Sequence, residues 1–480
     1  MNPVLQSDTV AMPMSERIRM NFIKSLSRRD FFLLSAAAGT SMIRPSFSEA
    51  ASRPETKPEL RGTIDPGRYG LVADASRSSA SYLGDLLRKA AARDMPVFLP
   101  PGTYPLSQLD LPENTRLTGI AGSSRIVFTG GSHFLRALGL KRLSLSGLVI
   151  DGANLPLSAE AKALLSAQSI SDLMIEDCEI TGSRLSGIHL QACRATLRRN
   201  RIGTVAEYGV LAVDGVNSAM TDNEVTNCGN GGILVHRSVK GSDRTMVTGN
   251  RIIRTRADYG GTGPFGNAIN LYRADDVLVS GNHIADSAFT AIRANAASNV
   301  QITNNQCLNS GETAIYSEFG FEGALVSGNL VDGGANGISV VNFDSGGRLG
   351  VISSNIVRNI RDTGPYVHDS VGFGYGIAAE ADVVISANVV ERVARFGLLA
   401  GWGAYLRNVL VTGNIIREAQ TGMAVSVVEE AGQATIANNL FEKTPKGAII
   451  GYRWHDAATG DLVAGSSAHK HLTIMNNRSG

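Results

Sequence analysis

The stretch that decides the fold is VTGNRI at residues 247–252, because close variants of it return along most of the chain. Later copies begin with VSGN at 279–282, ITNN at 302–305 and VSGN at 326–329. Each copy holds two alternating apolar residues, a small residue or Asn, an Asn, any residue and then an aliphatic. The Asn recurs every 23 to 33 residues, at positions 200, 223, 250, 282, 305, 329, 355, 388, 414 and 439.

A second phrase follows each Asn and consists of a small residue, an apolar residue, any residue and an apolar residue. Examples are GIHL at 187–190 and GILV at 232–235. These segments have the period of strands, and each is too short to bury an apolar face alone. Coiling them into a parallel solenoid gives the aliphatic residues one shared interior. Leucine-rich repeats are excluded because regular Leu triplets are absent. The repeats therefore predict an all-β parallel β-helix of roughly twelve coils.

The recurring Asn is expected at a corner of each coil. Asn tolerates left-handed backbone conformation, and its side-chain amide can bond to the Asn one coil away.

The cysteines show no metal-type spacing, and Cys307 falls in an inward aliphatic position, which predicts a small core residue. The net charge of +2, without a basic run interleaved with aromatics, gives no support for a nucleic-acid partner. The four cysteines are Cys178, Cys193, Cys228 and Cys307.

The N-terminal 50 residues have the pattern of an export signal. SRRDFFL at 27–33 precedes a short, weakly apolar run that ends at Ile43, and a small-x-small cleavage site follows near Ala50. This pattern predicts a twin-arginine signal peptide at 1–50, a linker at 51–61, the twin-arginine translocase as a partner and a periplasmic or secreted protein. The apolar run is too short to span a bilayer, so no membrane contact is expected in the mature form.

The remainder, 62–480, is predicted to be one β-helix domain with an N-terminal cap at 62–128 and repeats at 129–480. An open solenoid end exposes apolar core and bare strand edges, so an amphipathic helix is expected to cover it. Residues 81–94 supply that helix, and LTIMNN at 472–477 supplies the last coil. The apolar face of the helix is predicted to comprise Leu83, Leu86, Leu87, Ala90 and Ala91.

A resemblance to known proteins rests on this N-terminal segment. An amphipathic helix followed by VFLPPGTY at 97–104 resembles the start of pectate-lyase-like β-helix proteins, although ADAS at 73–76 replaces their usual Asp-Thr-rich phrase. Together with the Arg pair and the repeats, nearly the whole chain resembles twin-arginine-translocated β-helix repeat proteins of bacteria. The resemblance implies a right-handed parallel β-helix, a fold that also carries polysaccharide lyases and C5-epimerases. Its motifs specify fold and export, and no particular chemistry.

Function is expected from side chains that point outward. If the small residue of the second phrase begins a strand, the next residue points in and the one after points out. Adjacent coils lie about 4.8 Å apart, so outward residues stack into columns. Polar and aromatic residues gather in the middle of the columns, beside the two longest loops, 255–266 and 361–375, which predicts a groove for a linear chain. The central residues are His236, Asn270, Tyr272, Arg293, Asn295, Tyr316 and Glu318.

The leading hypothesis is β-elimination or C5-epimerisation of an acidic polysaccharide. Arg293, helped by Arg273, would neutralise a uronate carboxylate and acidify the adjacent proton. One of Tyr272, Tyr316 and His236 would remove that proton, and another would protonate the leaving oxygen or the opposite face. The residues expected to bind the substrate are Asn270, Arg273, Asn295 and Glu318.

Three alternatives stay open. A glycoside hydrolase needs two carboxylates facing the groove; Glu318 is the one in the central cluster, and Glu380 is expected to lie too many coils away. A non-catalytic glycan-binding or structural envelope protein would use Arg293 and Glu318 as an ion pair between coils. No cofactor is expected. A calcium-assisted lyase would need clustered Asp, and the one adjacent pair, Asp275 and Asp276, is expected in a solvated loop.

Overall fold

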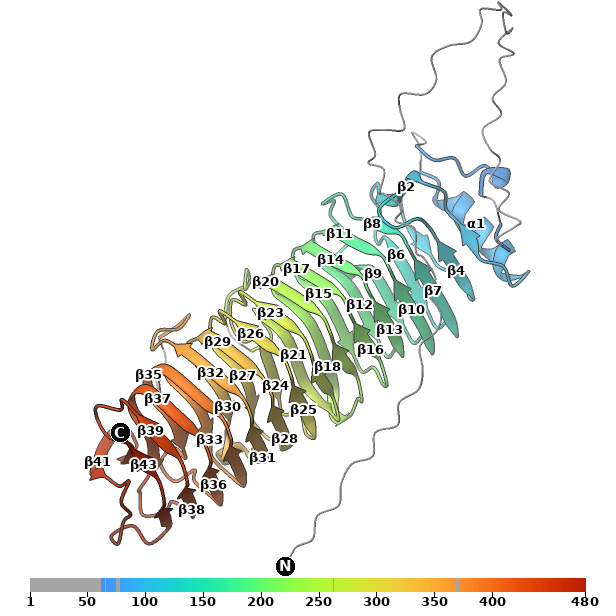
Figure 1. Ribbon diagram of the computed structural model, residues 1–480. Helices are drawn as coiled ribbons and strands as arrows, with labels where there is room; N and C mark the ends of the chain where they lie inside the picture. Colours follow the sequence, from blue (N-terminus) through green and yellow to red (C-terminus); the bar gives the residue numbers. More distant parts are fainter. Residues whose placement is uncertain (1–61, 65, 75–77, 262, 368–371) are drawn as a thin grey trace, which may run out of the picture. The chain divides into compact units, whose positions relative to one another are not determined.

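The computed structural model describes residues 62–64, 66–74, 78–261, 263–367 and 372–480. The strands stack coil upon coil into a parallel β-helix, as the repeats predict (Figure 1). One sheet has 15 strands and contributes one strand from each coil. Its strands are β1 (Val97–Phe98), β4 (Thr115–Thr118), β7 (Arg142–Ser146), β10 (Asp172–Glu176), β13 (Ala195–Arg198), β16 (Ala219–Thr221), β19 (Met246–Thr248), β22 (Leu278–Ser280), β25 (Val300–Thr303), β28 (Glu322–Ser327), β31 (Arg348–Ser353), β34 (Val383–Ser386), β36 (Val409–Thr412), β38 (Ala434–Ala437) and β42 (Leu472–Met475).

The second sheet has 28 strands and is built from two ladders. The strands that follow the corner are β2 (Gly102–Leu106), β5 (Ser124–Phe128), β8 (Val149–Asp151), β11 (Glu179–Ser183), β14 (Arg201–Val205), β17 (Glu224–Cys228), β20 (Arg251–Thr255), β23 (His283–Ala285), β26 (Gln306–Leu308), β29 (Leu330–Gly334), β32 (Ile356–Ile360), β39 (Leu440–Glu442) and β43 (Arg478–Ser479). The strands of the second phrase are β3 (Leu109–Asp110), β6 (Leu135–Leu138), β9 (Ala163–Gln168), β12 (Ser186–Gln191), β15 (Tyr208–Val213), β18 (Gly231–Ser242), β21 (Asn267–Asp275), β24 (Ile292–Asn295), β27 (Thr313–Glu318), β30 (Asn336–Val340), β33 (Tyr375–Ala379) and β40 (Ile449–Arg453). The long strands β35 (Val389–Ala400) and β37 (Ile415–Ser426) serve both ladders.

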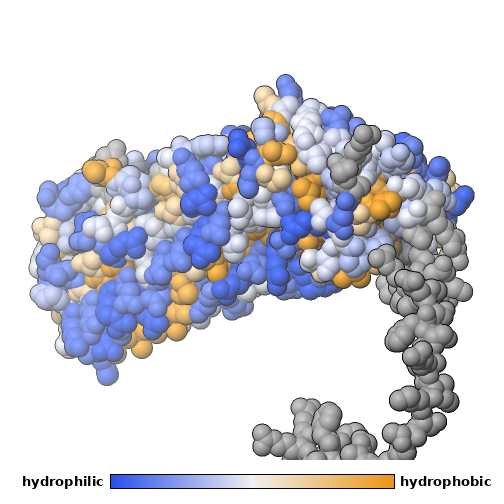
Figure 2. All heavy atoms as spheres, turned by 90° about the horizontal axis from the view of Figure 1, so that it is seen from above, coloured by the Kyte–Doolittle hydropathy of each residue, from blue (hydrophilic) through white to orange (hydrophobic). Residues whose placement is uncertain are grey.

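The core lies inside the coils and follows from the period-2 pattern. Val247, Val279 and Ile302 occupy equivalent positions on β19, β22 and β25, and all are buried. All four cysteines are free and buried, and burial raises the pKa of the Cys307 thiol to about 12. Cys307 is therefore the small core residue that its position predicts. On the face seen in Figure 2, hydrophilic side chains predominate and apolar ones form scattered patches.

The recurring Asn forms a buried side-chain ladder. The backbone N–H and the Nδ2 of Asn305 donate to Asn329 Oδ1 at 2.9 and 3.0 Å. Asn305 Oδ1 in turn accepts both groups of Asn282, at 3.0 and 2.9 Å. The ladder begins at Asn200 and reaches Asn477 in the last coil, which confirms that residues 472–477 add a coil. Each step therefore satisfies buried polar groups that would otherwise be costly.

The expected backbone conformation of these Asn residues is wrong. The left-handed residue is the one before each ladder position: Gly249 has φ +68°, and Asn304 and Ser354 both have φ +58°. The small or Asn residue in the third place of the phrase therefore makes the turn, because Gly and Asn adopt this region most readily. The ladder Asn is selected for its amide.

Each described end of the solenoid carries an element that lies outside the parallel repeats. Helix α1 (Ala80–Ala91) buries Leu83, Leu86, Leu87 and Ala90 and packs on β1, β3 and β4, which confirms the capping helix. Strand pairing already begins at Val97, so the coils start within the segment predicted as cap. At the other end, β40 pairs antiparallel with β41 (Asp456–Asp461) and stops the parallel ladder.

Two short 3-10 helices, η3 (Pro66–Tyr69) and η4 (Phe343–Ser345), complete the described elements. None of the helices in the described part of the chain is long and apolar enough to cross a membrane. The predicted signal peptide at 1–50 and linker at 51–61 lie outside the described residues.

Candidate functional site

The predicted columns exist in the predicted register. Asn270 on β21 pairs with Arg293 on β24, which pairs with Tyr316 on β27. In the parallel column, His236 is followed by Tyr272, Asn295 and Glu318. A shift of one residue in the register would place these side chains in the core. Because burying charged groups inside the coils is costly, the predicted register was the one that points them outward, and the strand pairing agrees with it.

The centre of the columns is closed rather than open. Arg293 is 6% exposed, and its Nε donates to Glu318 Oε1 at 2.6 Å. Glu312 Oε2 lies 3.8 Å from its Nη1, and the carbonyl of Gly263, in the loop 255–266, lies 3.5 Å from the same nitrogen. Asn295 also donates to Glu318 Oε1, at 2.7 Å. Burial lowers the pKa of Arg293, but the neighbouring carboxylates outweigh it and the pKa is raised. Because Arg293 is almost fully buried beneath the loop 255–266 and Glu312, a uronate can reach its guanidinium only if these groups move away.

The aromatic members of the columns are poorly suited to take a proton. Burial lowers the pKa of His236 to about 4, and its ring packs edge-on against Tyr272 with centroids 5.7 Å apart. Burial and the charge of Glu318 raise the pKa of Tyr316 well above its usual value, so its phenol stays protonated. Arg273 is the exposed cation of the predicted set; its guanidinium lies 4.9 Å from the Tyr272 ring centroid.

A pocket of about 320 Å³ lies further along the same column. From Tyr316 the column continues through Ser339 on β30 and Ala378 on β33 to Leu399 on β35. Ser339 and Ala378 are small and lie between larger residues, which creates the hollow. Of the predicted site residues, Tyr316 is the one found among the described residues that line it.

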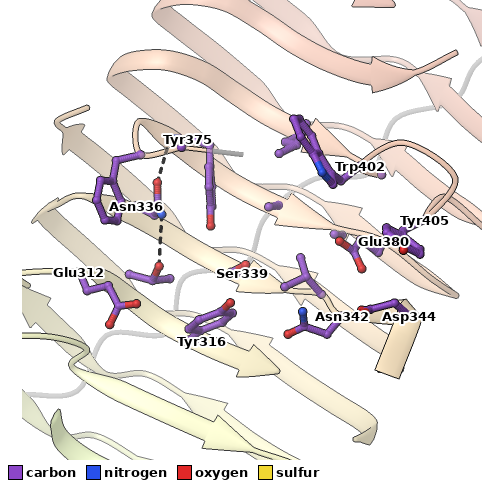
Figure 3. A pocket seen from close by; sticks show the side chains of 18 of the residues that line it. Glu312, Tyr316, Asn336, Ser339, Asn342, Asp344, Tyr375, Glu380, Trp402 and Tyr405 are labelled. Atoms are coloured by element: carbon purple, nitrogen blue, oxygen red, sulfur yellow. Dashed lines mark hydrogen bonds between the residues drawn. The ribbon is translucent and has the colours of Figure 1, made fainter. Parts of the chain in front are cut away.

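Aromatic side chains form the walls of this pocket (Figure 3). Tyr366, from the loop 361–375, stacks on Phe289 at 6.3 Å between ring centroids and meets Phe373 edge-on at 5.5 Å. The long loop therefore lies beside the columns, as its position in the repeat predicts. The wall residues are Tyr366, Phe373, Tyr375, Trp402 and Tyr405.

Three carboxylates line the pocket, and Figure 3 shows Glu312 at one end and Glu380 with Asp344 at the other. Glu312 Oε1 accepts the Tyr366 hydroxyl at 2.7 Å, and Oε2 accepts Thr290 Oγ1 at 3.2 Å. Glu380 is 8% exposed, and its Oε2 accepts the N–H of Phe343 at 2.7 Å. Burial, with a further contribution from Asp344, raises the pKa of Glu380 to about 7.

The sequence places the centre of the site at Arg293 and sets Glu380 outside that cluster. Glu380, which directly follows β33, instead lines the open pocket that begins at Tyr316, and neither Arg293 nor Glu318 is among the described residues of that lining. The sequence carried one signal that could have located the pocket: small outward residues at Ser339 and Ala378, flanked by aromatics, mark a hollow. No sequence pattern could have placed Trp402 and Tyr405 in the pocket, because they come from a loop, where the strand alternation does not predict the direction of a side chain.

Metal binding has little support in the described residues, which contain no group of three His, Cys, Asp or Glu arranged to hold an ion. Asp275 Oδ1 accepts the N–H of Ser298 at 2.7 Å, and Asp276 Oδ1 accepts Asn299 Nδ2 at 3.0 Å. These two carboxylates therefore stabilise turns between adjacent coils.

The chain is similar to several solved structures, at identities that show the fold alone. The pre-mature gene product 12 of bacteriophage phi29 matches 86% of this chain with 15% identity and a TM-score of 0.53. This chain spans 58% of the length of that protein. The catalytic unit of an α-1,3-glucanase from Streptomyces thermodiastaticus matches 90% of this chain and 70% of its own, with 17% identity and a TM-score of 0.46. The A-module of a mannuronan C-5 epimerase from Azotobacter vinelandii matches 87% and 99%, with 14% identity and a TM-score of 0.43.

No curated protein shows significant sequence similarity to the chain. Residues 157–252 and 238–356 match the family model of the right-handed β-helix region, which agrees with the parallel coils and assigns their hand.

Proposed function

We propose that the pocket between Glu312 and Glu380 hydrolyses glycosidic bonds in a neutral or amino-sugar glycan. The observation that carries the proposal is Glu380, a carboxyl with a pKa of about 7 beside a second carboxylate, Asp344. A pair of carboxyl groups, one of which donates a proton, is the machinery of most glycoside hydrolases. Aromatic walls with a few polar groups are the usual lining of a small-molecule site.

The charge of the pocket selects against an acidic substrate. Its lining includes Glu312, Asp344 and Glu380, and no Lys or Arg occurs among the described lining residues. A uronate carboxylate in this space would be repelled by like charges in a partly desolvated environment. A neutral sugar avoids this cost, and an ammonium group on an amino sugar would gain from it.

Each carboxyl has a distinct part in the proposed reaction. Protonated Glu380 donates its proton to the glycosidic oxygen as the bond from that oxygen to the anomeric carbon breaks. Asp344, which is exposed, activates the water that attacks the anomeric carbon or attacks it directly. Glu312, held by Tyr366, accepts hydrogen bonds from sugar hydroxyls at the other end.

The test is release of reducing ends from a panel of neutral and amino-sugar polysaccharides. Glu380→Gln and Asp344→Asn should each lower kcat by at least ~100-fold, the usual contribution of acid–base catalysis. Glu430→Gln, an exposed site outside the pocket, is the matched control and should leave the rate unchanged. Activity in the wild type should fall as pH rises through about 7, where Glu380 loses its proton. Full activity of Glu380→Gln would refute the assignment.

A second candidate keeps the elimination or C5-epimerisation of an acidic polysaccharide at the columns. It is favoured by exposed Arg273 beside Tyr272. A panel of alginate and pectate separates the two, with elimination monitored by the ultraviolet absorbance of unsaturated uronates and C5-epimerisation by the NMR signals of the anomeric protons. A signal lost in Tyr272→Phe and Arg273→Ala would support this candidate. Retention of the protein in an affinity gel without any product would favour a binding protein.

We further propose export by the twin-arginine route, on the basis of the Arg pair at 28 and 29.

A further inference from the structure

A second hollow, of about 510 Å³, lies on the same face near the N-terminal end of the solenoid. Its floor follows the outward column through Arg136 on β6, Ser166 on β9 and His189 on β12. Ser166 is short and stands between two long side chains, so the floor dips there. Gln168 and Gln191 occupy the neighbouring column and line the same space.

The hollow presents two cationic groups. Arg136 Nε donates to Asp110 Oδ1 at 2.7 Å, and Asp110 also lies 3.2 Å from His133 Nε2. This contact orients the guanidinium and leaves its two terminal amino groups without a hydrogen-bond partner among the described residues. Such a fixed fork matches the geometry of a carboxylate. Lys162, from the segment between β8 and β9, is exposed and has no ion-pair partner in the described part of the chain.

Two carboxylates accompany the two cationic side chains: Asp110 is paired with Arg136, and Glu160 lines the hollow with Lys162. Glu160 is the one carboxylate among the described lining residues, and a hydrogen bond from the Ser158 side chain lowers its pKa. Burial, together with the nearby charge of Lys162, lowers the pKa of His189. His189 is therefore neutral at pH 7 and offers one donor and one acceptor.

We infer that this hollow binds an acidic sugar unit. The sugar carboxylate is held by Arg136 and Lys162, and its hydroxyl groups bond to His189, Ser166 and the two Gln amides. The volume supports a sugar over an inorganic anion, because a water-sized species occupies only about 30 Å³. Small-molecule sites typically measure roughly 300–1,000 Å³, a range that includes this hollow.

The inference does not depend on the proposed hydrolysis. Five coil steps separate His189 from Tyr316 along the column, through Leu211, Leu234, Asn270 and Arg293. At about 4.8 Å a step, the two hollows are about 24 Å apart. They also differ in their lining, since the described lining of the pocket at Tyr316 contains no Lys or Arg, whereas this hollow has Arg136 and Lys162. Each can therefore be tested without the other.

The experiment is calorimetric titration of the full chain with tri-galacturonic acid and with its carboxyl-reduced, neutral counterpart. The acidic trisaccharide should bind the hollow, and any binding of the neutral trisaccharide, which the proposed function allows at the pocket at Tyr316, should be unchanged in Lys162→Ala. Lys162→Ala should weaken binding about tenfold or more, because charge-assisted hydrogen bonds contribute about 1.5–3 kcal/mol and each 1.4 kcal/mol is a factor of ten. Lys141→Ala removes the same charge from an exposed residue outside the hollow and should have no effect. Ser166→Phe should abolish binding by filling the floor, without changing the charge.

Three results would overturn the inference. Lys162→Ala would weaken binding of the neutral trisaccharide as much as that of the acidic one, or Lys162→Ala would match Lys141→Ala. Alternatively, sulfate would displace the trisaccharide as effectively as galacturonate does, which would reveal an unselective anion site. Circular dichroism of each variant establishes that it is folded, and Lys162→Ala keeps the test decisive if Ser166→Phe is not.

Discussion

Replacing Glu380 by Gln should remove a pH dependence from the stability of the protein. Burial raises the pKa of this carboxyl from 4.5 to about 7, so the folded chain binds its proton more tightly than the unfolded chain does. That difference corresponds to about 3 kcal/mol. Because the folded-state pKa is raised, this stability is fully present below pH 4.5 and is lost as pH rises through about 7. Glu380→Gln stays neutral and should not show this loss.

The assay is urea unfolding followed by circular dichroism at pH 4.5 and pH 8, values chosen to lie on either side of the titration from 4.5 to about 7. The free energy of unfolding of the wild type should decline between them by about 3 kcal/mol more than that of Glu380→Gln. Glu430→Gln, at an exposed site, should behave as the wild type does. An equal decline in Glu380→Gln and the wild type would refute the argument that a buried, protonated Glu380 exists at neutral pH.

Three other perturbations test the remaining features. Arg293→Met should lower the free energy of unfolding by about 3–5 kcal/mol, because Glu318 and Glu312 would keep buried, unpaired charge. Arg293→Met/Glu318→Met should recover part of this loss in the same assay. If Arg293→Met alone leaves the stability unchanged, the ion pair does not stabilise the fold. Asn305→Ala should lower the free energy of unfolding by about 2–4 kcal/mol, because two N–H groups of Asn282 lose their acceptor, whereas Gln301→Ala, at an exposed site on β25, should cost less than about 1 kcal/mol; equal losses would contradict the ladder. Replacing Arg28 and Arg29 by Lys should keep the protein in the cytoplasm in a cell-fractionation assay, while Lys at Arg17 and Arg19 should not; export of the first variant would exclude the twin-arginine route.

The sequence predicted the fold and the column register but misplaced the open site. Period-2 aliphatics and a recurring Asn leave few physical solutions, and the alternation that buries Val279 and Ile302 also orients Arg293 and Tyr316 outward. The predicted groove assumes that a side chain pointing out of the coils is exposed to solvent, whereas Arg293 points outward and is buried. Gly263 and Glu318 close over Arg293, a contact between distant segments that no local pattern encodes. The pocket formed instead where the column residues are small.

The Asn ladder has a consequence for the spacing of the two hollows. From Asn200 onward, each coil repeats the same hydrogen bonds at its corner, so adding or removing a whole coil in this part preserves the register on both sides. Duplicating the 23-residue unit between Asn282 and Asn305 would move the hollow at His189 and the pocket at Tyr316 apart by one step of about 4.8 Å and leave the residues of both unchanged. The number of coils between the two hollows therefore sets the distance between them. A glycan that occupies both hollows at once would have to span this distance, and gain or loss of a coil would change the length of the glycan that fits.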